Sequence, residues 1–346
     1  MFVTNETELV ENCKYLLPVT LFPLMSRNFL IMTANKLAAS TFQENYQSPF
    51  GRWNESSWIR SKPLREGKIE GLPFSPDLVP LAAHPAIASN STHWVTVLAY
   101  RLLAHLQFTT LLELSHVNPV CSSLAQGNAP IFLSTLQRND ALRIYCDEGG
   151  HALFVELFST QVEEAFGLNR SVIGRPHFDR IIEKIIAEHQ TRLSPHLIQL
   201  FFVTISETLV TKVLNNVPHD PQVSPIVRAV VADHAADEAL HSLYFRGLFP
   251  ILWQSLGSYE QEEMGQLLPQ LVWAFLGPDR RLEYSILRRL GFNANDSEGI
   301  LEEVYVHSQI AEFVRRAANP TLKMFAATGV FDDRTIEQVF ADYELI

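Results

Sequence analysis

The sequence has few cysteines and little positive charge. Three cysteines, Cys13, Cys121 and Cys146, are spread over 346 residues without a Cys-x-x-Cys pair. This argues against a disulfide framework and a thiolate zinc site, and it indicates a reducing, cytoplasmic location. Lys and Arg number 27 against 38 Asp and Glu, a net charge of −11. Nucleic acids and anionic membranes bind concentrated basic surfaces, so we expect neither as a partner.

The sequence also lacks the marks of export and of membrane insertion. Its first residues do not place a basic segment before an apolar one, as a signal peptide does. The most apolar long run, residues 94–115, contains Arg101, His105 and Glu113, and a membrane-spanning helix accepts few such groups. Small molecules and other proteins are therefore the expected partners.

What the sequence does have is helical periodicity from residue 93 onward. Ser194 with Pro195, and Ser224 with Pro225, each predict a helix start in which Ser is the N-cap and Pro the first helical residue. Gly167 is expected to end the second long helix and Pro250 the last, and Pro320 is expected to separate the last two short helices. The predicted long helices span about 92–115, 136–166, 195–215 and 225–249, and the shorter ones about 259–275, 280–290, 299–317 and 333–343.

The segment before these helices has a different composition. Residues 43–92 are rich in Pro, Ser, Asn and aromatic side chains and show no sustained period, so we predict an ordered, mostly irregular arm that suits a lid or a dimer contact. The predicted fold class is all-α, with one domain over residues 1–346. In it an N-terminal arm (about 1–92) precedes a four-helix bundle (about 93–250) and peripheral C-terminal helices (about 251–346).

Two of the long helices carry the same motif, Asp-Glu-x-x-His, at residues 147–151 and 237–241. Residues three apart project from one face of a helix, so Glu148 lies beside His151 and Glu238 beside His241. That face coincides with the apolar stripe of each helix. Both carboxylates are therefore predicted to point into the core, where an ionised group is costly unless a positive charge pairs with it.

A metal ion supplies that charge in the ferritin-like di-metal arrangement, which uses one Glu from each of two helices and a Glu-x-x-His pair from each of the other two. The lone glutamates are then Glu113, 35 residues before Glu148, and Glu207, 31 residues before Glu238. Such spacing lets one helix rise and the next return its pair to the same height. The sequence thus predicts a ferritin-like bundle around two metal ions.

His234 extends the predicted ligand set, because it precedes Glu238 by four residues and His241 by seven and so shares their face. Carboxylates with imidazoles suit iron or manganese. Asp147 and Asp237, which precede the two motif glutamates, are placed to accept a hydrogen bond from a ligand imidazole. The predicted ligands are Glu113, Glu148, His151, Glu207, His234, Glu238 and His241.

Other residues near the motifs have simpler interpretations. His116 forms a third Glu-x-x-His with Glu113 that the bundle does not need, and we interpret it as a chance match. His105, two turns before Glu113, fits a core histidine better than a residue lining the site. Gly149 and Gly150 each destabilise a helix by about 1 kcal/mol relative to Ala. They indicate either close packing or space for substrate beside the metals.

With these residues in view, the stretch from about 93 to 250 resembles the AurF-like di-iron N-oxygenases. These are ferritin-like enzymes that oxidise the amino group of p-aminobenzoate and of related arylamines. The resemblance rests on Glu113, DEGGH at 147–151, Glu207 and HAADEALH at 234–241. The additional histidine at His234 is characteristic of that family, whereas ferritins and most desaturases lack it.

The resemblance implies two iron ions, O₂ as oxidant and an amine substrate that becomes a hydroxylamine, nitroso or nitro product in secondary metabolism. The amine would be an arylamine or be derived from an amino acid, free or tethered to a carrier protein. The family also implies a homodimer. An external electron donor is required, because no Gly-x-Gly-x-x-Gly fingerprint of a flavin or nicotinamide site is present. A C-terminal arginine holds the substrate carboxylate in the arylamine enzymes, which makes Arg315 and Arg316 candidates here.

Two alternatives use the same ligands. Another di-iron oxidase, a C-hydroxylase or a desaturase, would attack a C–H bond instead of nitrogen. A non-enzymatic ferritin-like protein would store or sense metal, although storage cages use shorter subunits and need neither the arm nor His234. Manganese also fits the donor set.

Overall fold

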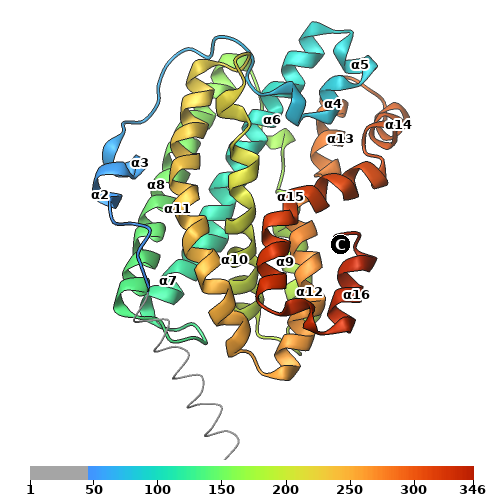
Figure 1. Ribbon diagram of the computed structural model, residues 1–346. Helices are drawn as coiled ribbons and strands as arrows, with labels where there is room; N and C mark the ends of the chain where they lie inside the picture. The colour runs from blue at the N-terminus through green and yellow to red at the C-terminus, as the bar shows by residue number, and fades with distance from the viewer. Residues whose placement is uncertain (1–45) are drawn as a thin grey trace, which may run out of the picture. The chain divides into compact units, whose positions relative to one another are not determined.

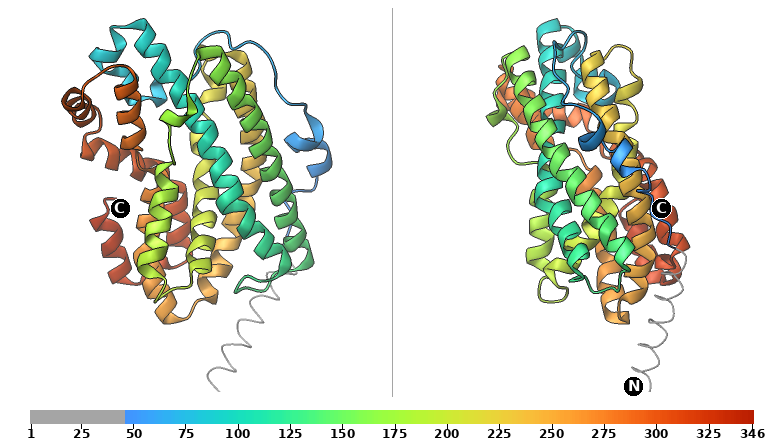
Figure 2. Two further views of the ribbon diagram at one scale, coloured as in Figure 1. Left: turned by 180° about the vertical axis from the view of Figure 1, so that it is seen from behind. Right: turned by 90° about the vertical axis from the view of Figure 1, so that its left-hand side faces the viewer.

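Four long helices form the centre of the molecule (Figure 1). The computed structural model describes residues 46–346, apart from the side chains of residues 210–213, and residues 48–346 form one unit. Helices α6 (Ser91–Leu112) and α8 (Thr135–Phe166) pack against each other, as do α10 (Pro195–Leu214) and α11 (Pro225–Ser255), and α8 also contacts α11. The α10–α11 pair faces the viewer in Figure 1 and the α6–α8 pair in the left view of Figure 2. The prediction of an all-α four-helix bundle is confirmed.

The start and stop signals of α8 and the start of α10 act locally, whereas the predicted N-cap Ser224 makes no side-chain hydrogen bond at the start of α11. The Ser134 hydroxyl accepts a hydrogen bond from the Gln137 main-chain N–H, and the Gln137 side chain accepts one from the Ser134 N–H. Gly167 ends α8 with a φ of 60°, a conformation that glycine adopts without strain. Ser194 caps α10 through its hydroxyl, which accepts from the Leu197 N–H.

The first bundle helix continues beyond its predicted end near residue 115. A π-helical turn, η2 (Glu113–Val117), leads directly into α7 (Asn118–Gln126). Pro119 has no N–H to donate, and it lies where the turn has already interrupted the α-helical hydrogen-bond ladder. The span Ser91–Gln126 is long and apolar enough to cross a membrane, but 56% of its most apolar window is buried inside the protein, as in a core helix.

Two prolines that were expected to end helices do not. α11 passes through Pro250 to Ser255, and α15 (His307–Ala327) passes through Pro320. A proline removes the hydrogen bond to the carbonyl four residues earlier, and for Pro250 that carbonyl belongs to the exposed residue Arg246. Trp253, which follows Pro250, packs on the Phe201 ring of α10, and Leu252 and Trp253 are buried. This burial outweighs the lost bond.

The C-terminal helices pack around the α10–α11 side of the bundle. The predicted helix at 299–317 is wrong, because an extended Val306 divides it into two helices. α9, which precedes the third bundle helix, was not predicted. α12 contacts α9 and α10, while α15 contacts α10. The bounds of the helices outside the bundle are α9 (His177–His189), α12 (Ser258–Leu276), α13 (Arg280–Arg289), α14 (Ala294–Val304) and α16 (Arg334–Asp342). Short 3-10 turns connect some of the helices, namely η3 (Arg170–Val172), η4 (Val217–His219) and η5 (Val330–Asp332).

The described part of the arm contains short helical turns joined by irregular chain. α2 (Trp53–Ser56) and α3 (Trp58–Ser61) lie beside the bundle, where α3 contacts α8 and α11 (Figure 1). The arm continues through η1 (Pro76–Leu78), α4 (Pro80–Ala83) and α5 (Pro85–Ala88) to α6. The predicted arm before residue 46 lies outside the described residues. One domain over residues 1–346 therefore stays a prediction.

Gly150 shows why the arm can lie so close to α8. A Cβ at this position would overlap the Ile59 side chain of α3. Of the two interpretations of the paired glycines, close packing therefore holds for Gly150. A Cβ at Gly149 would meet only the Asn118 amide, at 3.9 Å.

Candidate metal centre

The seven predicted ligands come together as two overlapping groups inside the bundle. In each group the possible ligand atoms, one from each residue, all lie within 4.8 Å of one another. The two groups share Glu148 and Glu238, as expected of two neighbouring ions bridged by carboxylates. We name them metal position 1, which consists of Glu113, Glu148, His151, His234 and Glu238, and metal position 2, which consists of Glu148, Glu207, Glu238 and His241.

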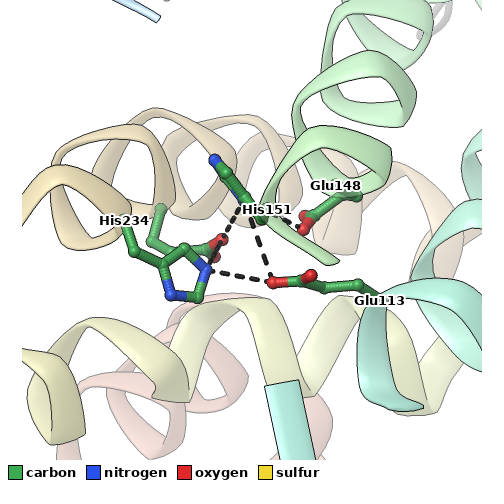
Figure 3. A group of neighbouring side chains, drawn as sticks. Glu113, Glu148, His151 and His234 are labelled. Atoms are coloured by element: carbon green, nitrogen blue, oxygen red, sulfur yellow. Dashed lines mark hydrogen bonds and ion pairs between the residues drawn. The ribbon is translucent and has the colours of Figure 1, made fainter. Parts of the chain in front are cut away.

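The four bundle helices bring these residues to the same level. Glu113 begins the π-turn at the end of α6, and α8, α10 and α11 supply the others. Figure 3 shows Glu113, Glu148, His151 and His234 converging from three of the helices. All seven side chains are buried. π-turns are frequent at functional sites. This one was not predicted, and the only signal in the sequence was Pro119 shortly after an apolar helix.

Six buried polar atoms of this cluster make no hydrogen bond with any described residue. The ion pairs that the described residues make with the four glutamates involve histidine only, not Lys or Arg. Buried polar groups without partners are costly, and two metal ions would satisfy these. The atoms that make no hydrogen bond are Oε2 of Glu113, both carboxylate oxygens of Glu148, Oε2 of Glu207, and Nδ1 of His151 and of His241.

Two aspartates orient the motif histidines. His151 Nε2 lies 2.9 Å from Asp237 Oδ2, and His241 Nε2 lies 3.3 Å from Asp147 Oδ2. Each imidazole therefore donates its Nε2–H to a carboxylate, which leaves the Nδ1 lone pair facing the glutamates, 3.0 Å from Glu148 in the case of His241. Metal-bound histidines are held in this way. The aspartate of each motif thus accepts a hydrogen bond from the histidine of the other motif.

Burial and mutual repulsion perturb the glutamates. Burial raises the pKa of Glu113 to about 8, although the hydrogen bond with His234 opposes the shift. Burial also raises the pKa of Glu207 well above its usual value, and the charges of Glu238 and Glu148 add to the rise. For Glu238 burial acts in the same direction, but the positive charge of His241, the nearby His151 and a hydrogen bond with His234 hold its pKa well below the usual range. Without metal, the site must bind protons.

The histidines carry those protons. Burial lowers the pKa of His151, but the hydrogen bond with Asp237 and the nearby carboxylates of Glu148 and Glu238 raise it further, to well above its usual value. Burial and the charge of His151 lower the pKa of His234, and its bonds with Glu113 and Glu238 bring the net value up to about 9. Divalent metals compete with such protons for the same lone pairs. The cluster therefore has the charge balance of a metal site that is filled by protons when metal is absent.

The arm supports the two aspartates from outside the bundle. The Trp53 indole Nε1–H lies 2.8 Å from both oxygens of Asp147, and the Ser57 hydroxyl donates to the same carboxylate at 2.6 Å. The Trp58 main-chain N–H donates to Asp237 at 2.9 Å. These supporting residues were not predicted, and the only signal in the sequence was the Trp- and Ser-rich composition of the arm.

The two nearby histidines do not belong to either group of ligands. His116 Nε2 lies 2.8 Å from Asp179 and its Nδ1 lies 2.6 Å from the Gln199 amide, so it is a buried residue with partners of its own. Burial lowers the pKa of His105 to about 3, and the charges of His234 and Arg101 contribute. His105 is therefore a neutral residue close to His234.

The two candidate arginines lie elsewhere. Arg315 and Arg316 are exposed on α15, and Arg316 Nη1 is 3.7 Å from Glu312 of the same helix. Neither is part of the metal cluster. That one of them binds the substrate stays a prediction, to which this placement adds no support.

Comparison with known protein families agrees with this geometry. A family model described as P-aminobenzoate N-oxygenase AurF matches residues 38–329. No curated protein matches the chain. The matched range covers most of the chain, from the arm through the bundle to the end of α15, so it includes all seven residues of the cluster.

Proposed function

Since the chain belongs to the AurF family of p-aminobenzoate N-oxygenases, we propose that it holds two iron ions and uses O₂ to oxidise the nitrogen of an amine. The product would be a hydroxylamine and, after further oxidation, a nitroso or nitro compound. The observation that carries the proposal is the pair of ligand groups that share Glu148 and Glu238 and contain buried, unpartnered donor atoms.

The residues present fit two divalent ions. Position 1 would use Glu113, His151 and His234, position 2 would use Glu207 and His241, and Glu148 and Glu238 would bridge. The four glutamates carry four negative charges, which balance two divalent cations. Oxygen and imidazole donors suit iron and also manganese. We propose iron, which supplies the electrons that activate O₂ when it is reduced.

The chain itself would orient the ligands and exclude water. Asp147 and Asp237 keep the imidazoles in the tautomer whose Nδ1 faces the cluster. The Trp58 ring, fully buried, lies 5.7 Å from the His151 ring and 4.9 Å from the Phe154 ring, centre to centre. This apolar cover protects an oxidising site from side reactions with water.

The family supports an arylamine as the first substrate class to test. We propose an arylamine first and an amine derived from an amino acid second, free or held by a carrier protein, in secondary metabolism. The electron donor would be a separate molecule, and the location cytoplasmic.

We also propose a homodimer, and an exposed apolar row on α8 supports it. Leu142, Tyr145, Leu153 and Leu157 are 44–55% exposed and recur at helical spacing, and Leu114 of the π-turn is 51% exposed. Leu153→Glu should convert a dimer into a monomer in light scattering after size exclusion. Phe313→Glu, on the distant helix α15 and 51% exposed, is the matched control.

The test of the proposed function begins with anaerobic loading of the purified protein with ferrous iron. Two irons per chain are expected. The loaded protein is then given an electron donor, ¹⁸O₂ and a panel of arylamines and amino acids, and products are analysed by mass spectrometry. Label bound to nitrogen supports the proposal.

The alternatives give different outcomes in the same experiment. Label on carbon, or loss of two hydrogens, would indicate a C-hydroxylase or a desaturase. Iron uptake without product, in a large shell of subunits, would indicate storage. Absence of bound metal would refute the site.

A further inference from the structure

The metal cluster is too deeply buried for a donor protein to contact it. All seven ligand side chains are at most 5% exposed. Electrons must therefore cross the protein, and transfer weakens steeply with distance and with each gap between groups that are not bonded. The best route is a short series of hydrogen bonds that ends at a partly exposed, polarisable side chain.

The arm provides one such series. Trp53 is partly exposed, and its indole Nε1–H is hydrogen-bonded to Asp147 at 2.8 Å. Asp147 Oδ2 is 3.3 Å from His241 Nε2, and His241 belongs to metal position 2. Two hydrogen bonds thus connect an aromatic ring at the surface with a ligand of the cluster.

The equivalent route at the other aspartate does not reach the surface in the same way. Asp237, which holds His151, accepts from the main-chain N–H of Trp58 and not from its indole. The Trp58 ring is fully buried and its Nε1 has no hydrogen-bond partner. Of the two aspartate–histidine pairs, only the Asp147–His241 pair ends at a partly exposed ring.

Two exposed arginines and one exposed glutamate, Glu55, lie on the segment that carries Trp53, so this segment has a positive net charge although the chain as a whole is acidic. Arg52 and Arg60 are exposed on the same short segment, and the Arg60 guanidinium lies 5.5 Å from the centre of the Trp53 ring. The chain carries a net charge of −11. A local basic patch on an acidic protein favours an acidic partner and guides it to this point.

We propose that Trp53 is where electrons from an acidic one-electron carrier protein reach the metal centre, through Asp147 and His241. The inference rests on the proposed di-iron function. Two carrier molecules each lose one electron, two ferric ions each gain one, and no covalent bond of the protein is made or broken. Trp53 is not itself a metal ligand, because electrons would pass from it through Asp147 to the ligand His241.

The experiment measures reduction of the ferric centre and not turnover. Wild-type protein, W53F and S57A are loaded with iron, oxidised, and mixed anaerobically with a reduced [2Fe–2S] ferredoxin in a stopped-flow instrument. Parallel mixing uses reduced methyl viologen, a small molecule that does not require a docking face. Iron content and midpoint potential are measured for each protein.

S57A is the matched control, because Ser57 also donates to Asp147 but contributes no ring. W53F should be reduced by ferredoxin at least tenfold more slowly than wild type and at least fivefold more slowly than S57A, because S57A measures what the loss of one hydrogen bond to Asp147 does by itself. Iron content and midpoint potential should be the same in the two variants. If W53F does not retain iron, W53H keeps a ring N–H near Asp147 and replaces it in the comparison. R60E should also slow reduction by ferredoxin but not by methyl viologen.

Other results would overturn the inference. Equal slowing of W53F and S57A, with a shifted potential, would mean that Trp53 only positions Asp147. Wild-type rates in W53F would mean that electrons take another route, and an unchanged rate in R60E would exclude docking at this patch. Failure of the proposed function is distinguishable, because then the wild-type protein itself would bind no iron or form no oxidised amine.

Discussion

The two metal positions are built from the same motif but are not equivalent. Position 1 is surrounded by five residues with two imidazoles, and position 2 by four residues with one. The difference comes from His234, which has no counterpart one turn before the motif of α8, where Ile144 is buried instead. A repeated motif can therefore give an asymmetric centre. We expect position 1 to bind metal more tightly and position 2 to leave more room for exchangeable ligands.

The arm also supports the two positions unequally, but here position 2 receives more support than position 1. Asp147, which holds His241 of position 2, accepts hydrogen bonds from the side chains of Trp53 and Ser57. Asp237, which holds His151 of position 1, accepts one main-chain bond. The position with fewer ligands is thus the one that depends more on the arm.

Removing a shared ligand should have the largest effect, because it damages both positions. Glu148→Ala or Glu238→Ala should lose metal and activity together, as measured by elemental analysis and product formation. Glu164→Ala, at an exposed glutamate of the same helix as Glu148, should retain both. Retained activity in either of the first two variants would refute the site.

Removing one histidine should weaken iron binding at one metal position more than at the other. Loss of a group that merely orients a ligand weakens metal binding by about 10–100-fold, so loss of a ligand should cost at least as much. His241→Ala leaves position 2 without an imidazole and should bind about one iron per chain. His234→Ala leaves His151 at position 1 and should bind two, the second more weakly. Anaerobic titration with ferrous iron measures how many ions each variant binds and how tightly. Identical binding curves for the two variants would contradict the proposed difference between the two positions.

Metal binding should strengthen as pH rises, chiefly at position 1. The pKa of Glu113 is raised to about 8 and that of His234 to about 9, so both bind protons that metal must displace. Each displaced proton changes affinity by about tenfold per pH unit below the pKa. Ferrous titrations from pH 6 to 8 should show tighter binding and proton release. Binding that does not vary with pH would contradict this.

The same pKa shifts make the stability of the metal-free protein depend on pH. A group with a raised pKa in the folded state stabilises the fold fully below its unfolded pKa, and this contribution is lost as pH rises through the folded value. For Glu113 the window runs from 4.5 to about 8, and for His234 from 6.5 to about 9. The melting temperature of the metal-free protein should therefore fall between pH 5 and 9. Iron-loaded protein should show a smaller decrease.

The smallest effects are expected from two Gly→Ala substitutions, which test how closely the arm packs on α8. Gly150→Ala should push Ile59 away from α8 and lower the free energy of unfolding by about 1–3 kcal/mol. Gly299→Ala, in α14 with open space around the position, should raise it by about 0.5–1 kcal/mol. Urea denaturation measures both. Because the arm supports Asp147 more than Asp237, Gly150→Ala should also weaken the second iron more than the first.

Much of the bundle was predictable because its signals are local. The N-caps Ser134 and Ser194, the stop at Gly167 and the apolar stripes all act within one or two helical turns. The errors occurred where packing overrode a local rule. Pro250 and Pro320 are tolerated because the helix beyond each of them is buried, which a proline by itself does not reveal.

The sequence by itself determined the number, chemistry and spacing of the candidate metal ligands, because residues three or four apart must share a helix face. Only the tertiary structure decided which aspartate holds which histidine, that a π-turn begins at Glu113, and that Trp53 and Ser57 of the arm complete the surroundings of Asp147. These contacts join residues about 90 positions apart. They depend on how helices and arm pack in space, which the periodicity of any single segment does not contain.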